Sequence, residues 1–406
     1  MKKSILKVLL VAVLLFVATI PMLGCDEDLP IVWQHVSGDG NSWDIPVVMN
    51  AGEELVINKE HFSHIEFEFE EFEIQTRWTD DDNVIEIVNN TITAHYSGIV
   101  HIYASLFSSP TTLNGRRVRI GRSAPVGYIY VINEETMTHI TTAQELADMN
   151  NNLDGHFILM ADIDLGDFGE WTPIGRVIPI AEQPNWSATQ RRRQGAFRGM
   201  FVNPHGYVIR NLTITTSEVM RDVGLFGFVY GDDTFIYGVV LEDISIDVSD
   251  FEEDRGGTTV GGIAGVVFGD VMIKNCVVSG TIIGGIQVGG IVGANSHGFI
   301  INSHFVGFIR VERDRNYTAR YFAIGGIAGF NHFTRQGRVT ANIINCTVVA
   351  DLDGGEWADV GGIVGVTHNR YAIVNTSFKG TYSGRRAGTK IGWLNFPFDE
   401  GPINFE

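Results

Sequence analysis

Apolar residues in the second half of the chain come in short runs that a Gly-Gly pair interrupts at intervals. The full phrase, apolar-Gly-Gly-Ile-apolar-Gly, occurs four times, as Val260–Gly265, Val288–Gly293, Ile324–Gly329 and Val360–Gly365. The first residues of these copies are 28, 36 and 36 positions apart. Such spacing is typical of a repeat protein with inserts in some copies.

A second landmark follows each full copy: a short apolar stretch that ends in asparagine. The four asparagines are Asn275, Asn302, Asn345 and Asn375. Each repeat then offers three short apolar runs, such as 262–267, 271–278 and 280–283, with Gly or polar residues between them. No single repeat can bury its own apolar face, so the copies must stack and enclose a shared interior.

Stacked copies of this kind predict a right-handed parallel β-helix, because parallel connections are right-handed in nearly all cases. Strands of the same phase stack about 4.8 Å apart and place equivalent residues above one another. We therefore expect the isoleucine after each Gly-Gly pair to form one buried column. We also expect the four asparagines to form a structural ladder at a corner, with the glycines permitting a sharp bend or a positive φ.

These residues resemble the GLUG-motif repeats of bacterial surface proteins. The family pattern is roughly Gly-Gly-Leu-Val-Gly followed by Ile-x-Asn-Ser/Cys, and this chain has Ile where Leu is usual. The resemblance covers about residues 138–394 and places the repeats proper at 215–406. It implies an exported β-helical protein of the kind found among adhesins and some surface proteases, and it does not by itself imply an activity.

Residues 136–214 are predicted to cap the β-helix and to form its entry rungs. Thr142 and Glu145 have the spacing of a capping box, which predicts a short helix ending near Asn150. A solenoid needs such a cover over its first open rung. Within this segment, the polar insert 176–196 carries Arg191–Arg193, and we expect it to be an exposed loop.

Residues 31–135 are predicted to form a separate small β domain. Apolar and acidic residues alternate in Ile65–Glu70 and in Ile85–Ile87, which indicates strands with one solvated face. The stretch from Arg77 to Ala104 resembles the bacterial Ig-like repeat, and the resemblance implies a β-sandwich. We expect this domain to be a spacer.

The first residues are predicted to be an export signal rather than part of the fold. Lysines precede the apolar run Val8–Ile20, which has the length of a secretory core. The next residues, Met22–Cys25, resemble the lipobox of bacterial lipoproteins. The resemblance implies a signal peptide at 1–24, lipidation of Cys25 and a tether at 25–30, and it predicts a lipid-anchored protein of the bacterial cell surface. The alternative is an ordinary secretory peptide with an incidental cysteine.

Composition supports an exported, β-rich chain and excludes some partners. Glycine supplies 47 of 406 residues, above the roughly 7% average, and the net charge is −19. Such a charge argues against nucleic acid and against an anionic membrane surface as partners. Cys276 and Cys346 fall two coils apart, roughly 9.6 Å, which exceeds the ~7 Å Cα limit for a disulfide. We expect two free, buried thiols.

The search for catalytic motifs is negative. None of the 12 histidines lies in a His-Glu-x-x-His motif, and the chain has no Gly-x-Ser-x-Gly, Walker or Cys-x-x-Cys sequence. We therefore expect no catalytic residues, no metal and no cofactor. Two roles remain open for a group of three aspartates, Asp162, Asp164 and Asp167. They could hold calcium, or they could accept hydrogen bonds from turn amides.

Three classes of function remain: an adhesion or ligand-binding module, which we favour, a polysaccharide lyase or hydrolase, and a non-binding structural component of the envelope. Lengthened polar segments precede three Gly-Gly phrases, at 247–259, 310–323 and 351–359. If each repeat is one coil, these segments emerge along the same edge. Their aromatic residues are predicted to bind a glycan or a host or extracellular protein, and they are Phe251, Tyr317, Tyr321 and Trp357. The alternative is that the segments are tolerated insertions without a partner.

Overall fold

The computed structural model describes residues 31–33, 47–59, 68–76, 83–113, 116–177, 182–183, 185, 187–215, 221–231, 234–249, 258–311, 322–332, 342–368 and 373–394. The predicted signal peptide, the tether, Cys25, Phe251, Tyr317 and Tyr321 lie outside these ranges. The chain separates into two compact units, Met1–Val131 and Ile132–Glu406. This boundary falls close to the predicted one at residue 135.

The first unit is built around one core from strands that pair mostly in antiparallel fashion, with one parallel pair. Its larger sheet centres on β9 (Arg116–Ile132) and β7 (Gly98–Phe107), with β4 (Glu71–Thr76), β1 (Ile31–Trp33), β2 (Val47–Asn50) and β8 (Thr111–Leu113). A second sheet joins β3 (Glu54–Val56), β6 (Thr91–Ala94) and β5 (Ile85–Val88). Buried residues of both sheets, including Ile92 and Ile102, form one hydrophobic cluster. The strand predicted over Ile85–Ile87 is confirmed as β5.

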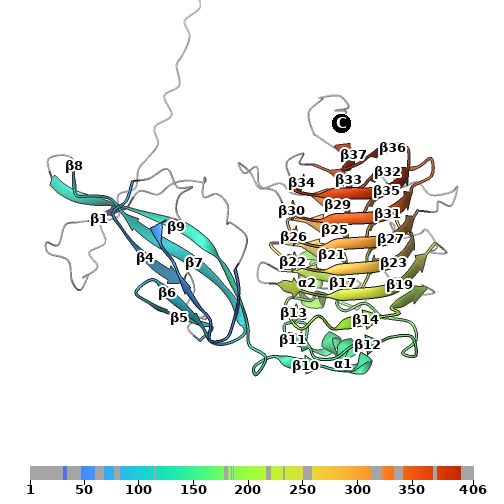
Figure 1. Ribbon diagram of the computed structural model, residues 1–406, viewed down its shortest axis with the longest axis horizontal. Coiled ribbons are helices and arrows are strands. Elements are labelled where there is room, and N and C mark those ends of the chain that lie inside the picture. Colours follow the sequence, from blue (N-terminus) through green and yellow to red (C-terminus); the bar gives the residue numbers. More distant parts are fainter. Residues whose placement is uncertain are drawn as a thin grey trace, which may run out of the picture. The chain divides into compact units, whose positions relative to one another are not determined.

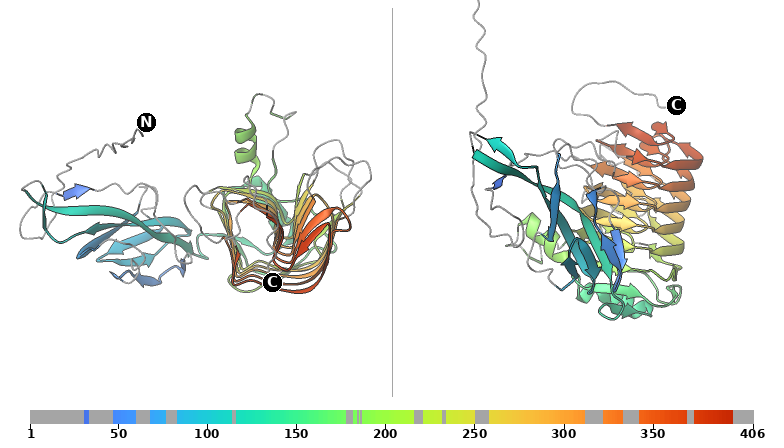
Figure 2. Two further views of the ribbon diagram at one scale, coloured as in Figure 1. Left: turned by 90° about the horizontal axis from the view of Figure 1, so that it is seen from above. Right: turned by 60° about the vertical axis from the view of Figure 1, so that its left-hand side comes forward.

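The second unit is a parallel β-helix. The chain passes through four sheets in turn, and each strand pairs in parallel with the equivalent strand of the next coil (Figure 1). Figure 2 shows the coils superposed when the unit is viewed along its stack. The coils stack because a single coil cannot bury its own apolar side chains, and the neighbouring coils cover them.

The four sheets are numbered in the order in which each coil of the repeats visits them, and the entry segment adds strands to sheets 1 and 2 before sheets 3 and 4 begin. Sheet 1 contains β10 (Thr138–Ile140), β11 (His156–Leu159), β13 (Met200–Val202), β18 (Phe235–Tyr237), β22 (Met272–Lys274), β26 (Phe299–Ile301), β30 (Ile343–Ile344) and β34 (Ile373–Val374). Sheet 2 contains β12 (Ile163–Asp164), β14 (Val208–Arg210), β15 (Thr213–Thr215), β19 (Val240–Val248), β23 (Val277–Gly284), β27 (His304–Arg310), β31 (Thr347–Asp353) and β35 (Ser377–Ser383). Sheet 3 contains β16 (Asp222–Val223), β20 (Thr259–Gly261), β24 (Gln287–Gly289), β28 (Phe322–Gly325), β32 (Ala358–Gly361) and β36 (Arg386–Gly388). Sheet 4 contains β17 (Phe226–Tyr230), β21 (Ala264–Phe268), β25 (Val292–Ser296), β29 (Ala328–His332), β33 (Val364–Thr367) and β37 (Ile391–Leu394).

Each repeat forms one coil, but a coil has four strands and not three apolar runs. The run 271–278 is divided between β22 and β23 because Asn275 adopts a φ of 58° and turns the chain. The Gly-Gly phrase is likewise divided, between β20 and β21. A backbone in the left-handed region ends a strand even within a run that is mostly apolar.

The three glycines of each phrase are required by space, as the copy at Ile324–Gly329 shows. A Cβ on Gly325 would overlap the carbonyl oxygen of Ala328, three residues later in the same turn. A Cβ on Gly326 would overlap Val348, which packs from sheet 2. A Cβ on Gly329 would overlap the amide nitrogen of Val288 in the preceding coil. The glycines therefore permit close approach of backbones. Of the two expected uses, a sharp bend or a positive φ, the second does not apply to these three glycines.

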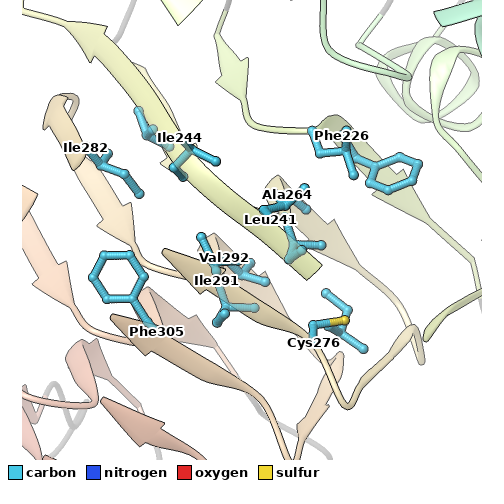
Figure 3. Close-up of a cluster of buried hydrophobic side chains, with 14 of the residues drawn as sticks. Phe226, Leu241, Ile244, Ala264, Cys276, Ile282, Ile291, Val292 and Phe305 are labelled. Carbon is cyan, nitrogen blue, oxygen red and sulfur yellow. The ribbon is translucent and has the colours of Figure 1, made fainter. Parts of the chain in front are cut away.

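The interior is a continuous column of apolar side chains. The isoleucines after the Gly-Gly pairs are all fully buried, and they are Ile263, Ile291, Ile327 and Ile363. Backbone amides join them coil to coil, with N···O distances of 3.0, 3.1 and 2.9 Å. The predicted column is confirmed. Figure 3 shows Ile291 among side chains from several coils, including Phe226, Phe305 and Cys276.

Both cysteines of the β-helix are free and buried, as predicted. Burial raises the pKa of the Cys276 and Cys346 thiols to about 12. A thiol with so high a pKa has little thiolate character, which suits a small core residue.

The entry segment contains one helix that the sequence predicts and one that we missed. The α1 helix (Ala143–Asp148) begins with the Thr142–Glu145 capping box, and Leu146 covers the core beneath it. The insert predicted to be a loop contains α2 (Ala188–Gly195). Ser187 and Gln190 form a second capping box, and the Ala, Gln and Arg residues after Ser187 favour a helix. The prediction was wrong because the polarity of the segment was given more weight than its capping signal.

Candidate ligand-binding edge

The segments predicted to carry the binding site connect sheet 2 to sheet 3. The strands that they leave are in register from coil to coil, as Arg310 pairs with Asp353 and Asp353 with Ser383. The connections therefore leave sheet 2 along one edge, which we call the loop edge. The sequence-predicted residues Phe251, Tyr317 and Tyr321 lie outside the described residues. Trp357 lies within them.

Trp357 is held in a short turn between β31 and β32. Its side chain is 48% exposed, a high value for the largest apolar residue. Asp353 Oδ1 accepts a hydrogen bond from the Gly355 amide at 3.2 Å, and Gly355 has a φ of 54°. The Ala358 amide donates to the Gly354 carbonyl at 3.1 Å. This turn presents an aromatic ring to solvent on a fixed backbone.

The turn rests directly on the next coil. The Gly354 amide donates to the Ser383 carbonyl at 2.8 Å, and the Arg385 amide donates to the Ala358 carbonyl at 2.8 Å. The Ser383 hydroxyl also donates to Asp353 at 2.9 Å, and this bond is the main reason why the pKa of Asp353 is lowered. The turn of Trp357 and the turn of Arg385 are therefore neighbours at one coil spacing.

Two arginines of the last coil bind one buried carboxylate. The side chain of Asp359 in β32 is 0% exposed. Arg386 donates from Nε and one terminal nitrogen at 2.7 and 2.8 Å, and Arg385 donates to the same carboxylate at 3.1 to 3.3 Å. The Arg386 guanidinium lies 3.8 Å from the ring centroid of Trp393. We call Trp357, Asp359, Arg385 and Arg386 the arginine cluster.

The arginine cluster was missed at the sequence level, although a signal for it exists. Asp359 and Arg386 occupy the same position of successive copies, immediately before Val360 and Ala387, and they pair in the structure. Opposite charges at matching positions of adjacent coils predict an ion pair once the phase of the repeat is known. We assigned the charged residues to loops and aligned only the apolar positions of the repeats, so this ion pair was not predicted.

The four asparagines of the predicted ladder lie at the corner between sheets 1 and 2. All four adopt a positive φ, and Asn275, Asn302, Asn345 and Asn375 have values of 58°, 50°, 55° and 51°. The Asn302 side chain donates to Asn275 Oδ1 at 3.1 Å, a bond between neighbouring coils. Asparagine tolerates the left-handed region better than other residues with a side chain, so its first role is to turn the backbone.

A second set of asparagines, not singled out in the sequence, is buried where sheet 4 leads to sheet 1. Asn295 donates to Asn331 Oδ1 at 2.9 Å, and Asn331 and Asn342 donate to each other at 3.1 and 3.0 Å. Asn295 and Asn342 both also donate to the Gly298 carbonyl at 2.9 Å. Because these buried polar groups satisfy one another, the network fixes the corner at little desolvation cost.

Aromatic and histidine rings form a stripe along the outer part of sheet 4. The rings of Tyr230 and Phe268 are stacked with an interplanar angle of 4° and a centroid distance of 5.5 Å. Further along, His297, His332 and His368 follow at centroid distances of 5.7 and 4.8 Å. Burial lowers the pKa of His332 and of His368, and the neighbouring histidine lowers each further. Rings that contact one another coil by coil stabilise the stack of coils.

The aspartates of the entry rungs accept hydrogen bonds from turn and strand groups. Asp162 accepts the Val208 amide at 2.8 Å, and Asp164 accepts the Gly166 amide at 2.9 Å and the Asn211 side chain at 2.8 Å. Of the two alternatives, these bonds favour turn capping. Within the described ranges, no group of three or more His, Cys, Asp or Glu side chains could hold a metal ion. No helix among those residues is long and apolar enough to cross a membrane.

Comparisons with known proteins give weak similarity. No protein-family model matches the chain, and no curated protein matches it. One similar solved structure is an IgA1 protease, with a TM-score of 0.38 and 13% identity over 85% of this chain and 28% of that chain. Another is a Bacteroides ovatus protein provisionally assigned as an immunoglobulin A1 protease, with a TM-score of 0.33 and 17% identity over 66% of this chain and 82% of that chain. The chain thus spans less than a third of the first of these proteins, and similarity at this level carries no activity across.

Proposed function

We propose that this protein is a lipid-anchored bacterial surface protein that binds a ligand for adhesion along the loop edge of its β-helix. The observation that carries the proposal is the exposed Trp357 on a turn that hydrogen bonds hold against the next coil. A large ring on a fixed backbone loses little conformational entropy when it binds, which is why such residues dominate binding sites.

The rest of the chain fits this role as a tethered display. Lipidation at Cys25 would anchor the chain, and the repeats would belong to the GLUG-type, right-handed β-helices. The first unit, with two mostly antiparallel sheets around one core, would be the Ig-like spacer between anchor and β-helix. In this arrangement the loop edge is the part that meets an extracellular glycan or protein.

One observation favours the alternative of a polysaccharide-cleaving enzyme. Asp222, at the start of sheet 3, has a pKa that burial raises to about 7, although Arg221 and Arg192 oppose the rise. A carboxylic acid with its pKa raised toward neutral pH is what a glycosidase uses as its general acid. Such an enzyme also needs a second carboxylate across a groove. Release of reducing sugar by the purified protein would favour this function over adhesion.

The lipid anchor is tested by substitution of the predicted lipidation site. With Cys25 intact, the protein should partition into the detergent phase when expressed in a bacterium that processes lipoproteins. Cys25→Ala should move it to the aqueous phase, because an unlipidated chain loses its acyl anchor. Phase separation followed by immunoblotting measures the change. Retention of the substituted protein in the detergent phase would mean that Cys25 is not the anchor.

The binding role is tested with Trp357→Ala. We expect adhesion to the ligand found on a glycan and matrix array to fall about tenfold or more, because truncation of a central aromatic anchor costs ~2 kcal/mol. The control is Tyr96→Ala, which removes an exposed ring from the first unit and should leave adhesion unchanged. If Tyr96→Ala abolishes adhesion and Trp357→Ala does not, the binding site belongs to the first unit.

A further inference from the structure

We propose that Arg385 and Arg386 form a carboxylate-binding subsite, so that the ligand of the loop edge is an acidic glycan whose sugar ring packs on Trp357. This inference rests on the proposed function and narrows it to one class of ligand. It depends on three features of the arginine cluster: fixed arginines, unused donors and a local excess of positive charge.

The arginines are fixed by the buried acid beneath them. Asp359 is 0% exposed, while the side chains of Arg385 and Arg386 are 42% and 38% exposed. Each guanidinium is thus bonded to a buried carboxylate and remains partly exposed to solvent. The ring of Trp393 at 3.8 Å holds the plane of the Arg386 guanidinium through a cation–π contact. Arginines restrained in this way lose little side-chain entropy when a ligand binds.

The hydrogen bonds to Asp359 leave donors for a second anion. Both arginines use Nε and Nη2 for Asp359. Within the described part of the chain, no protein acceptor is bonded to Nη1 of Arg385 or Arg386. Each Nη1 has two N–H groups, and a guanidinium fork matches the geometry of a carboxylate.

The charges of the cluster favour an anion at this position. Two guanidiniums share one carboxylate, so one positive charge remains on a chain whose net charge is −19. The nearby Asp353 is already paired with Arg310, at 3.2 Å. Glu356 is exposed on the same turn as Trp357 and would repel an anion. Glu356→Gln is therefore expected to strengthen binding of an acidic ligand.

The neighbouring Trp357 indicates that the carboxylate belongs to a sugar. The turns of Trp357 and Arg385 are bonded backbone to backbone, so we place the ring and the guanidiniums against one bound oligosaccharide. A sugar ring packs its C–H face on indole, while its carboxylate takes the charge-assisted hydrogen bonds. Uronic acids and sialic acids both supply this chemistry. A flexible acidic peptide would use the arginines without needing the aromatic ring.

The test measures binding of the full-length protein by calorimetry in detergent, with three probes. These are oligogalacturonate, a sialylated oligosaccharide and the carboxyl-reduced, neutral form of oligogalacturonate. We expect one of the two acidic sugars to bind and the reduced form to bind about tenfold more weakly or worse. The acidic sugar that binds identifies the source of the carboxylate. Equal binding of the acidic and reduced forms, or no binding of either acid, would overturn the proposal.

Variants separate the subsite from the fold. Arg386→Ala is expected to weaken acidic-sugar binding about tenfold or more, and Arg386→Lys is expected to restore only part of it because lysine lacks the planar fork. Arg198→Ala is the matched control, since Arg198 is also partly exposed and paired with an acid, Asp154, at 2.6 Å. Binding that stays unchanged in Arg386→Ala, measured below its melting temperature, would refute the subsite. Tighter binding of oligoglutamate than of either sugar would assign the arginines to a protein ligand.

The two proposals fail separately. If adhesion depends on Trp357 but acidic sugars bind Arg386→Ala normally, the loop edge is a binding site without a carboxylate subsite. If acidic-sugar binding requires Arg386 but adhesion is unaffected by Trp357→Ala, the subsite exists and the adhesion site lies elsewhere.

Discussion

Substitution of Ile327 by aspartate is expected to lower the free energy of unfolding by about 3–5 kcal/mol. Ile327 is fully buried in the middle of the isoleucine column, and its amide donates to Ile363 in the next coil at 2.9 Å. A carboxylate in that position loses its hydration and finds an apolar column in place of a partner. Thermal unfolding followed by circular dichroism should show a much lower melting temperature.

The control for this prediction is the same change on the outside of a strand. Val349 in β31 is 47% exposed, so Val349→Asp should change the stability by no more than about 0.5 kcal/mol. Comparison of Ile327→Asp with Val349→Asp separates the cost of burying a charge from the general effect of adding an acid to an acidic chain. Equal melting temperatures for the native protein and Ile327→Asp would contradict the placement of this column inside the coil.

The repeat made most of the β-helix predictable. Because the Gly-Gly phrase has a fixed order, each copy could be assigned to one coil, and Val288 does pair with Ile324 and Ile324 with Val360. The number of sheets was not predictable by the same route. Asn275 was expected at a corner, but the run 271–278 that contains it was counted as one run, and the positive φ of Asn275 divides that run into two strands.

Less of the candidate site could be predicted. Trp357 was identified because an aromatic residue in a polar insert stands out in the sequence. Asp359 and Arg386 were not, because each alone is an ordinary charged residue and their contact joins different coils. The buried Asn295–Asn331 pair was missed for the same reason, since cross-coil partners are many residues apart and appear together only once the register is known.

The sequence did contain the signals for both entry helices, but only one was used. Thr142 stands before an apolar stretch and was recognised as a helix start. Ser187 has the same Ser/Thr-x-x-Glu/Gln spacing, but the residues after it are polar, and the segment was assigned to a loop. The Arg193 guanidinium lies 5.8 Å from the ring centroid of Tyr230 in the structure. A polar helix on the outside of a β-helix needs no apolar face when its long side chains make the contact.

Replacement of Gly325 by alanine is the second change with a large expected effect, and it tests why the repeat contains glycine. The new Cβ would overlap the Ala328 carbonyl oxygen and lie 2.7 Å from the Ile363 carbonyl oxygen. The first atom belongs to the same turn and the second to the next coil, and neither backbone atom can rotate away. We therefore expect a loss of about 3 kcal/mol and a lower melting temperature.

Gly169→Ala is the matched control because it separates space from backbone conformation. Gly169 has a φ of +92°, and nothing lies within 4 Å of a Cβ built there. Alanine at this position is strained by its backbone alone, which costs about 1 kcal/mol. If close packing of coils is the reason for the Gly-Gly phrase, Gly325→Ala must be clearly the more damaging of the two. Equal losses would mean that conformational freedom, and not the spacing of the coils, maintains glycine in the repeat.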